Sequence, residues 1–220
     1  MFRRTLKEEL THKDFRVAIY GSARIKKNDK VYKQVFDLAK AIGKYEFDIV
    51  TGGGQGLMGA ATDGHRAGDT RKKSDAIGLT IRLPWETKPN KHLEIKEHFN
   101  KFSNRLDTFM DLSSVAVIMP GGIGTCLELF YTLQLIQVKH ISPIPVILVG
   151  EMWVQLVKWI EKYPVKLGLI STKDLSSIHI AKTNTEAMKI ILKTSEIFIK
   201  EGKNFRKNIK KYKLNGKKNS

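Results

Sequence analysis

Short apolar runs alternate with segments of helical periodicity, and this alternation restricts the fold more than any other feature of the chain. The apolar runs lie at residues 16–20, 47–51, 76–81, 114–119 and 144–149. Between them, apolar residues recur at helical spacing, as at 31–42, 102–110, 125–138 and 152–160. Near-continuous apolar strands joined by helices are typical of a parallel sheet covered by helices on both faces. With right-handed crossovers, this pattern predicts a doubly wound, Rossmann-like α/β fold.

We expect a single domain over residues 1–199, because neither a repeat nor an internal linker interrupts the pattern. The 220-residue chain carries 39 Lys and Arg against 22 Asp and Glu, a net charge of +17 that invites a nucleic-acid partner. About half of this excess lies in residues 200–220, which contain nine basic residues and one acidic residue. We expect this tail to be disordered, and nucleic-acid contact is an alternative for the tail alone. The remaining charge suits the attraction of anionic nucleotides.

Several protein classes are excluded by composition. The lone cysteine, Cys126, rules out a disulfide framework and a Cys-based zinc site, and the six histidines show no metal-ligand spacing. The N-terminal segment lacks the apolar core of a signal peptide, and no apolar run approaches the roughly 18 residues of a membrane helix. We therefore expect a cytoplasmic protein without membrane association.

Three loops rich in small residues follow predicted strands, at Gly21–Arg24, Gly52–Gly56 and Gly121–Thr125. In a doubly wound sheet, ligands bind at such loops, beyond the carboxyl ends of the strands. Glycine lets the backbone approach a ligand closely, and the N–H groups at a helix start favour an anion. We therefore expect a phosphate-bearing ligand. The candidate substrate-binding residues are Gly21, Ser22, Gly53, Gly54, Gly121, Gly122, Gly124 and Thr125.

The stretch GQGLMG at 54–59 matches the dinucleotide fingerprint G-x-G-x-x-G between a strand and a helix. The acidic residue expected after the next strand is missing, and Arg82 stands there instead, which would suit only a 2′-phosphate. A dinucleotide site is therefore a secondary alternative. The Walker lysine pattern is absent from the chain, which argues against an ordinary P-loop ATPase.

The stretch MPGGIGTCLELF at 119–130 is the most informative segment. Glu128 follows Thr125 by three residues, about 4.5 Å along a helix axis. Spacing alone leaves two alternatives open: Glu128 faces the ribose of a bound nucleotide, or it closes a capping box with Thr125. Arg105, in the predicted helix before this strand, is the candidate cation for a phosphate or a departing base.

At these residues the chain resembles the Lonely Guy (LOG) family, whose members are often labelled lysine decarboxylases. The family pattern PGGxGTxxE is met in full at residues 120–128, and TGGGQGLMG at 51–59 resembles the family's second glycine loop. The stretches 20–24, 77–90, 133–137 and 168–171 are also similar to its longer bacterial members. The resemblance spans roughly residues 16–195 and leaves out the basic tail.

This resemblance implies a nucleoside 5′-monophosphate phosphoribohydrolase, which releases a free base and ribose 5-phosphate. The substrate would be AMP or, in cytokinin-producing organisms, an N6-modified AMP. The family match places Arg105 and Glu128 in the catalytic positions and the phosphate at Gly121–Thr125; it implies a homodimer and neither metal nor pyridoxal phosphate. Where the family usually has lysine, histidine and threonine, this chain has Leu106, Asn100 and Gln134. The rival hypothesis is a non-catalytic carrier of molybdenum cofactor or nucleotide, since such carriers resemble this family.

Overall fold

The computed structural model describes residues 4–81 and 89–202. Its centre is a seven-stranded sheet with the strand order β4-β3-β2-β1-β5-β6-β7, in which every neighbouring pair is parallel. The strands are β1 Arg16–Tyr20, β2 Asp48–Thr51, β3 Ala76–Ile81, β4 Ile95–Phe99, β5 Val115–Ile118, β6 Val146–Val149 and β7 Ile178–Ala181. The predicted α/β, Rossmann-like fold is confirmed.

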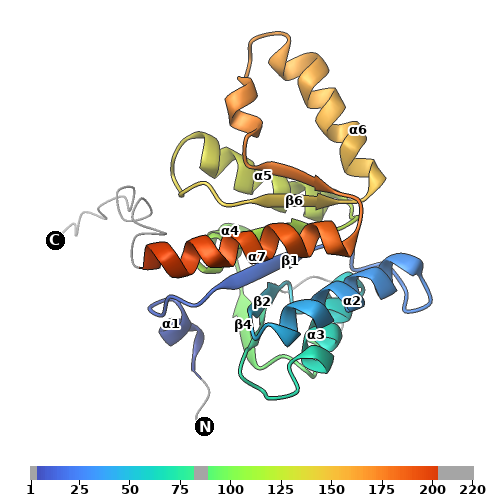
Figure 1. The fold of residues 1–220 in the computed structure, drawn as a ribbon, viewed down its shortest axis with the longest axis vertical. Coiled ribbons are helices and arrows are strands. Elements are labelled where there is room, and N and C mark those ends of the chain that lie inside the picture. Colours follow the sequence, from blue (N-terminus) through green and yellow to red (C-terminus); the bar gives the residue numbers. More distant parts are fainter. Residues whose placement is uncertain (1–3, 82–88, 203–220) are drawn as a thin grey trace, which may run out of the picture.

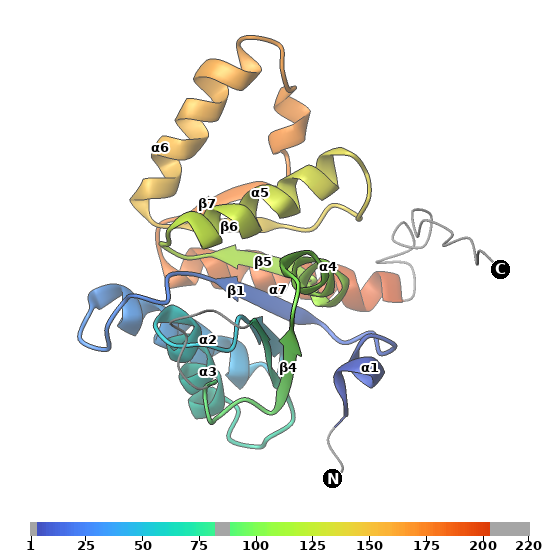
Figure 2. The same cartoon turned by 180° about the vertical axis from the view of Figure 1, so that it is seen from behind.

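Helices cover both faces of this sheet (Figures 1 and 2). They are α1 Leu6–Glu9, α2 Lys30–Lys44, α3 Leu57–Gly68, α4 Phe102–Leu112, α5 Ile123–Gln137, α6 Glu151–Ile160 and α7 Asn184–Glu201. Apolar residues of α2, α3 and α7 form one core with the sheet, and those of α4, α5 and α6 form a second core on the other face. A π-helical turn, Glu161–Val165, and a 3-10 turn, Thr172–Leu175, follow α6.

Helices α2 and α3 approach each other closely because α3 carries glycine at the contact. A Cβ atom on Gly64 would lie 2.2 Å from the carbonyl oxygen of Phe36, and one on Gly68 would lie 2.0 Å from that of Lys40. Any larger residue would push the helices apart, so this face of the sheet depends on the small-residue composition of α3.

The two edge strands were not predicted from the sequence. In β4, the residues after Ile95 are half-buried or exposed, and β7 is buried only at its last residue, Ala181. An edge strand has one neighbour and less helix cover, so it does not need the continuous apolar run that identifies a central strand. Helix α7 begins after Thr183, whose hydroxyl accepts a hydrogen bond from the backbone N–H of Glu186 at 3.2 Å.

A buried ion cluster anchors α1 beneath the amino end of β1. Arg16, 1% exposed, donates to Glu9 and lies 3.1 Å from the Asp14 carboxylate and 3.4 Å from that of Asp48. Burial raises the pKa of Asp48 to about 7, against the opposing effects of the Asp75 backbone N–H and the Arg16 charge. Since the arginine lies among the three carboxylates, the cluster is assembled around a cation that the chain itself provides.

Two expectations lie outside what the structure describes. Residue Arg82 and residues 203–220 of the basic tail are not among the described residues, so the boundary at residue 199 stays a prediction. Helix α7 itself runs to Glu201. Within residues 4–81 and 89–202, no helix combines the length and the apolar character needed to cross a membrane.

Candidate functional site

The strand order creates a switch point between β1 and β5. From β1 the chain proceeds through β2 and β3 to β4 on one side, and it then crosses back to place β5 on the other side of β1. Ligands of doubly wound sheets bind in the crevice that such a reversal opens at the carboxyl edge. The three glycine-rich loops follow β2, β1 and β5, which are adjacent strands at the centre of the sheet.

Backbone hydrogen bonds tie these loops together. The Ser22 N–H donates to the carbonyl of Pro120 at 3.1 Å, which joins the loop after β1 to the loop after β5. The Leu57 N–H donates to the carbonyl of Ser22 at 2.9 Å, which joins the start of α3 to the same loop. The predicted substrate-binding residues therefore belong to one connected group of loops. Gly21 and Ser22 follow β1, Gly53 and Gly54 follow β2, and Gly121, Gly122, Gly124 and Thr125 follow β5.

The start of α5 excludes one of the two alternatives for Glu128. The helix begins at Ile123 with Gly122 as its N-cap, so Thr125 lies inside the first turn, and the capping-box alternative is wrong. Thr125 is buried and packs over Gly121, where a Cβ atom would lie 2.1 Å from the threonine hydroxyl oxygen. At Gly122 and Gly124, in contrast, a Cβ atom would meet no atom within 4 Å. This first turn therefore leaves open space for an anion beside the positive end of the helix.

Helices α4 and α5 bring Arg105 and Glu128 together. An Arg105 Nη1–H donates to Glu128 Oε1 at 3.2 Å, and Arg105 Nε donates to the carbonyl of Leu79 at 2.7 Å. The guanidinium also lies 5.0 Å from the centre of the Phe109 ring. The two charged side chains are only 9% and 12% exposed. Contacts from β3, α4 and α5 thus fix the predicted catalytic pair in one geometry.

Gly52 completes this arrangement and was not among the predicted site residues. A Cβ atom on Gly52 would lie 2.6 Å from Arg105 Nη2, so the guanidinium needs a glycine beside it. The next residue, Gly53, has φ +72°, a conformation that side chains other than glycine's rarely adopt. The run of three glycines at 52–54 was the signal for this close approach.

Burial raises the pKa of Glu128 to about 7, while the charge and the hydrogen bond of Arg105 act in the opposite direction. Near neutral pH the carboxyl group therefore exchanges readily between its acid form and its carboxylate form. Such a carboxyl group is suited to accepting a proton from water or to stabilising a developing cation. Perturbed carboxyl groups of this kind are concentrated at functional sites.

One of the three departures from the LOG pattern is accounted for by packing. Leu106 is 5% exposed and contributes apolar surface to α4. A second cation at this position would require burial of a charge. Asn100 and Gln134 are both exposed.

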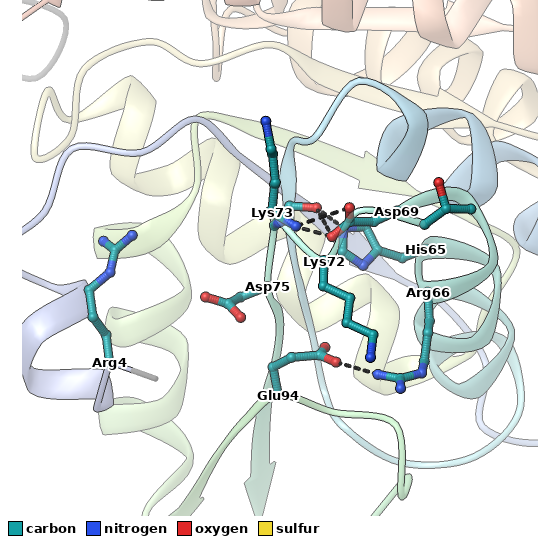
Figure 3. A pocket seen from close by; sticks show the side chains of 10 residues that line it. Arg4, His65, Arg66, Asp69, Lys72, Lys73, Asp75 and Glu94 are labelled. Carbon is teal, nitrogen blue, oxygen red and sulfur yellow. Dashed lines mark hydrogen bonds and ion pairs between the residues drawn. The ribbon is translucent and has the colours of Figure 1, made fainter. Parts of the chain in front are cut away.

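A separate cavity of about 360 Å³ lies at the opposite edge of the sheet, near the start of β3 (Figure 3). The Asp69 carboxylate there accepts hydrogen bonds from the N–H and the hydroxyl of Ser74, at 2.9 and 3.0 Å, and His65 Nε2 lies 3.1 Å from that hydroxyl. Arg66 is paired with Glu94 at 2.9 Å. These side chains connect the end of α3 with the segment before β3 and with Glu94, and the lining of this cavity includes no residue of the glycine-rich loops.

Residues 58–191 match the sequence model of a family described as "Possible lysine decarboxylase". A 140-residue stretch is 29% identical to the pyrimidine/purine nucleotide 5′-monophosphate nucleosidase of Escherichia coli strain K12. That stretch covers 61% of this chain but only 30% of the length of the Escherichia coli protein.

Solved structures share the fold. The molybdenum cofactor carrier protein of Chlamydomonas reinhardtii has a TM-score of 0.61 and 20% identity, with 83% of this chain and 99% of that chain covered. The molybdenum cofactor binding protein of Rippkaea orientalis has a TM-score of 0.61 and 17% identity, with 84% of this chain and 98% of that chain covered. At these identities the likeness shows the common architecture alone.

Proposed function

The chain belongs to the family described as "Possible lysine decarboxylase", the LOG family that its glycine motifs resemble, and from this premise we propose that it hydrolyses nucleoside 5′-monophosphates. The proposed reaction cleaves the N-glycosidic bond of AMP or an N6-modified AMP to give the free base and ribose 5-phosphate. The name of the Escherichia coli relative, a nucleotide 5′-monophosphate nucleosidase, supports this class of reaction.

The buried pair of Arg105 and Glu128 is the observation that carries the proposal. It lies beside the glycine-rich loops at the carboxyl edge of the sheet, with a guanidinium nitrogen 3.2 Å from a carboxylate oxygen. We assign the phosphate to the open first turn of α5, at Gly122 and Gly124, and the ribose to the region of Glu128. A monophosphate ester meets backbone N–H groups and a helix dipole there.

The chemistry follows from these positions. The bond between C1′ and the base nitrogen breaks, the oxygen of water joins C1′, and a proton passes to the departing base. The transition state has oxocarbenium character, so the Glu128 carboxylate stabilises positive charge at C1′ or accepts the proton of the attacking water. Arg105 orients this carboxylate and keeps part of it ionised at neutral pH.

A panel of nucleoside 5′-monophosphates, scored for free base by chromatography, tests the proposal. Nucleosides and nucleoside triphosphates serve as controls, because a site built for one phosphate on ribose should reject both. We expect release from AMP or N6-modified AMP. Absence of release from every monophosphate would contradict the proposal.

A carrier of molybdenum cofactor is the second candidate function, favoured by the carriers that share the fold. A carrier needs a binding surface but no ionisable group poised at neutral pH. Co-purification of a fluorescent pterin with the full chain, unchanged in a Glu128→Gln variant, would favour this candidate.

We also propose that a second copy of the chain covers α5 and α6. Large apolar side chains are exposed there, among them Ile123 at 88%, Leu127 at 44% and Trp159 at 52%. Helix α5 has apolar residues on all sides, a pattern of buried helices, and α6 projects away from the sheet (Figure 1). In a sedimentation experiment we expect Leu127→Glu to give monomers, whereas Ile199→Glu, at an exposed residue of α7, should leave the dimer intact.

A further inference from the structure

A second cavity, of about 810 Å³, lies beside the glycine loop after β2, and its lining includes four basic side chains. We propose that this cavity binds a small anion with two or more phosphate groups, as a site distinct from the one that takes the nucleoside monophosphate. Its volume falls in the range of small-molecule pockets. The side chains that carry the argument are those of Arg24, Lys26, Lys27, Tyr32, Asp63 and Lys91.

The catalytic pair is not part of the lining of this cavity. Neither Arg105 nor Glu128 lines it, nor does the segment 121–125, although Gly54, a predicted substrate-binding residue, does line it. The loop after β1 and the start of α3 meet at the cavity, because the Leu57 N–H donates to the Ser22 carbonyl at 2.9 Å. No side chain fits at that contact, since a Cβ atom on Gly56 would lie 2.4 Å from the Ser22 oxygen.

Charge favours an anion in this cavity. Arg24, Lys26, Lys27 and Lys91 line it, and none of the four forms an ion pair with a residue in the described ranges 4–81 and 89–202. The single carboxylate of the lining, Asp63, is engaged: Asn90 Nδ2 donates to it at 3.2 Å, and His92 Nδ1 lies 2.8 Å away.

The number of cations indicates the class of ligand. One phosphate monoester carries about −1.5 to −2 charges at pH 7, which would leave half of the four cations without a counter-charge. Two or three linked phosphates balance the set. The twelve-residue helix α3 begins directly after Gly56, a residue of the lining, and its N-terminus adds partial positive charge there.

The cavity and the catalytic pair share a structural element, the loop at residues 52–56. The Asn90 N–H, on the cavity wall, donates to the Gly53 carbonyl at 2.9 Å. On the other side of the loop, Gly52 lies against the Arg105 guanidinium. A ligand that shifts Asn90 therefore acts on Gly53, the neighbour of the glycine that leaves room for Arg105, so the cavity is placed for regulation of the site.

Calorimetric titration of the full chain tests this inference, with inorganic tripolyphosphate and ATP as two separate probes. The variant Lys26→Ala/Lys27→Ala/Lys91→Ala removes three cations of the cavity. The control Lys182→Ala/Lys189→Ala/Lys193→Ala removes the same charge from exposed positions that do not line it. We expect tripolyphosphate affinity to fall at least about tenfold in the first variant and less than about twofold in the second.

The ATP arm distinguishes the source of the phosphates: tighter binding of ATP than of tripolyphosphate identifies a nucleoside polyphosphate, and equal binding identifies a free polyphosphate. The inference would be overturned if both triple variants lost the same factor in tripolyphosphate affinity, or if neither probe bound to the unmodified chain. Displacement of tripolyphosphate by AMP would also overturn it, because the cavity would then belong to the substrate site. Since binding is measured directly, the result is independent of whether the chain hydrolyses AMP.

Discussion

Replacing Arg105 by glutamine separates two roles that the geometry allows for this residue. Arg105 lies 3.2 Å from Glu128 and, by its charge and hydrogen bond, lowers the pKa of that buried carboxyl. A cation at this distance lowers a carboxyl pKa by about one to three pH units, so its removal should raise the Glu128 pKa by a similar amount. From the present pKa of about 7, even the smallest such rise reduces the ionised fraction at pH 7 about fivefold.

The assay is the pH profile of kcat/KM for adenine release from AMP between pH 5.5 and 9.5. We expect the unmodified chain to gain about tenfold in rate between pH 6 and pH 8, since the carboxylate is the active form. In the Arg105→Gln variant this ascending limb should move to higher pH. The loss of kcat/KM relative to the unmodified chain should therefore shrink as the pH rises.

An Arg105→Lys variant is the matched control, because it keeps the charge and should keep the limb near neutral pH. The second ionisation of the AMP phosphate, near pH 6, affects the assays of all three proteins equally. It therefore cancels in the ratio of their kcat/KM values. If Arg105→Gln lost the same factor in kcat/KM at every pH, Arg105 would not act through the pKa of Glu128. Its role would then be to stabilise the transition state directly.

Three further predictions follow from the described contacts. Glu128→Gln should lower kcat at least about 100-fold, while calorimetry shows AMP binding within a fewfold of the unmodified chain. Gly124→Ala should raise the KM for AMP with little change in melting temperature, because its Cβ enters open space, whereas Gly121→Ala should lower the melting temperature because it displaces Thr125. The raised pKa of Asp48 means that the folded state holds this proton more tightly, so its contribution to stability is present below about pH 4 and is lost as the pH rises through about 7. Urea unfolding at pH 4.5 and 7.5 measures how far the free energy of unfolding declines between the two pH values. This decline should be smaller in Asp48→Asn than in the unmodified chain; an equal decline in both would show that Asp48 is not its source.

The central strands and most helices could be predicted because their patterns are local. Strands β1, β2, β3, β5 and β6 are buried on both faces, and a mostly apolar run of residues identifies them without knowledge of their neighbours. Strands β4 and β7 could not be identified in this way, because an edge position relaxes the demand for apolar residues. The buried cluster around Arg16 was also hidden, since nothing in the spacing of Glu9, Asp14 and Asp48 shows that they meet.

The glycine motifs predicted which loops form the candidate site, because glycine is required wherever backbone must approach backbone or ligand. They left the role of Glu128 open between a capping box and a site carboxylate. The fold excluded the capping box by starting α5 at Ile123, and it placed Arg105 of α4 against the carboxylate, a contact between residues 23 positions apart. Burial then raised the pKa of Glu128 to about 7, a property that depends on the surrounding protein and is invisible in the order of residues. The sequence determined which groups are present; tertiary packing determined their charge and their partners, because desolvation and Coulomb interactions depend on distances in space.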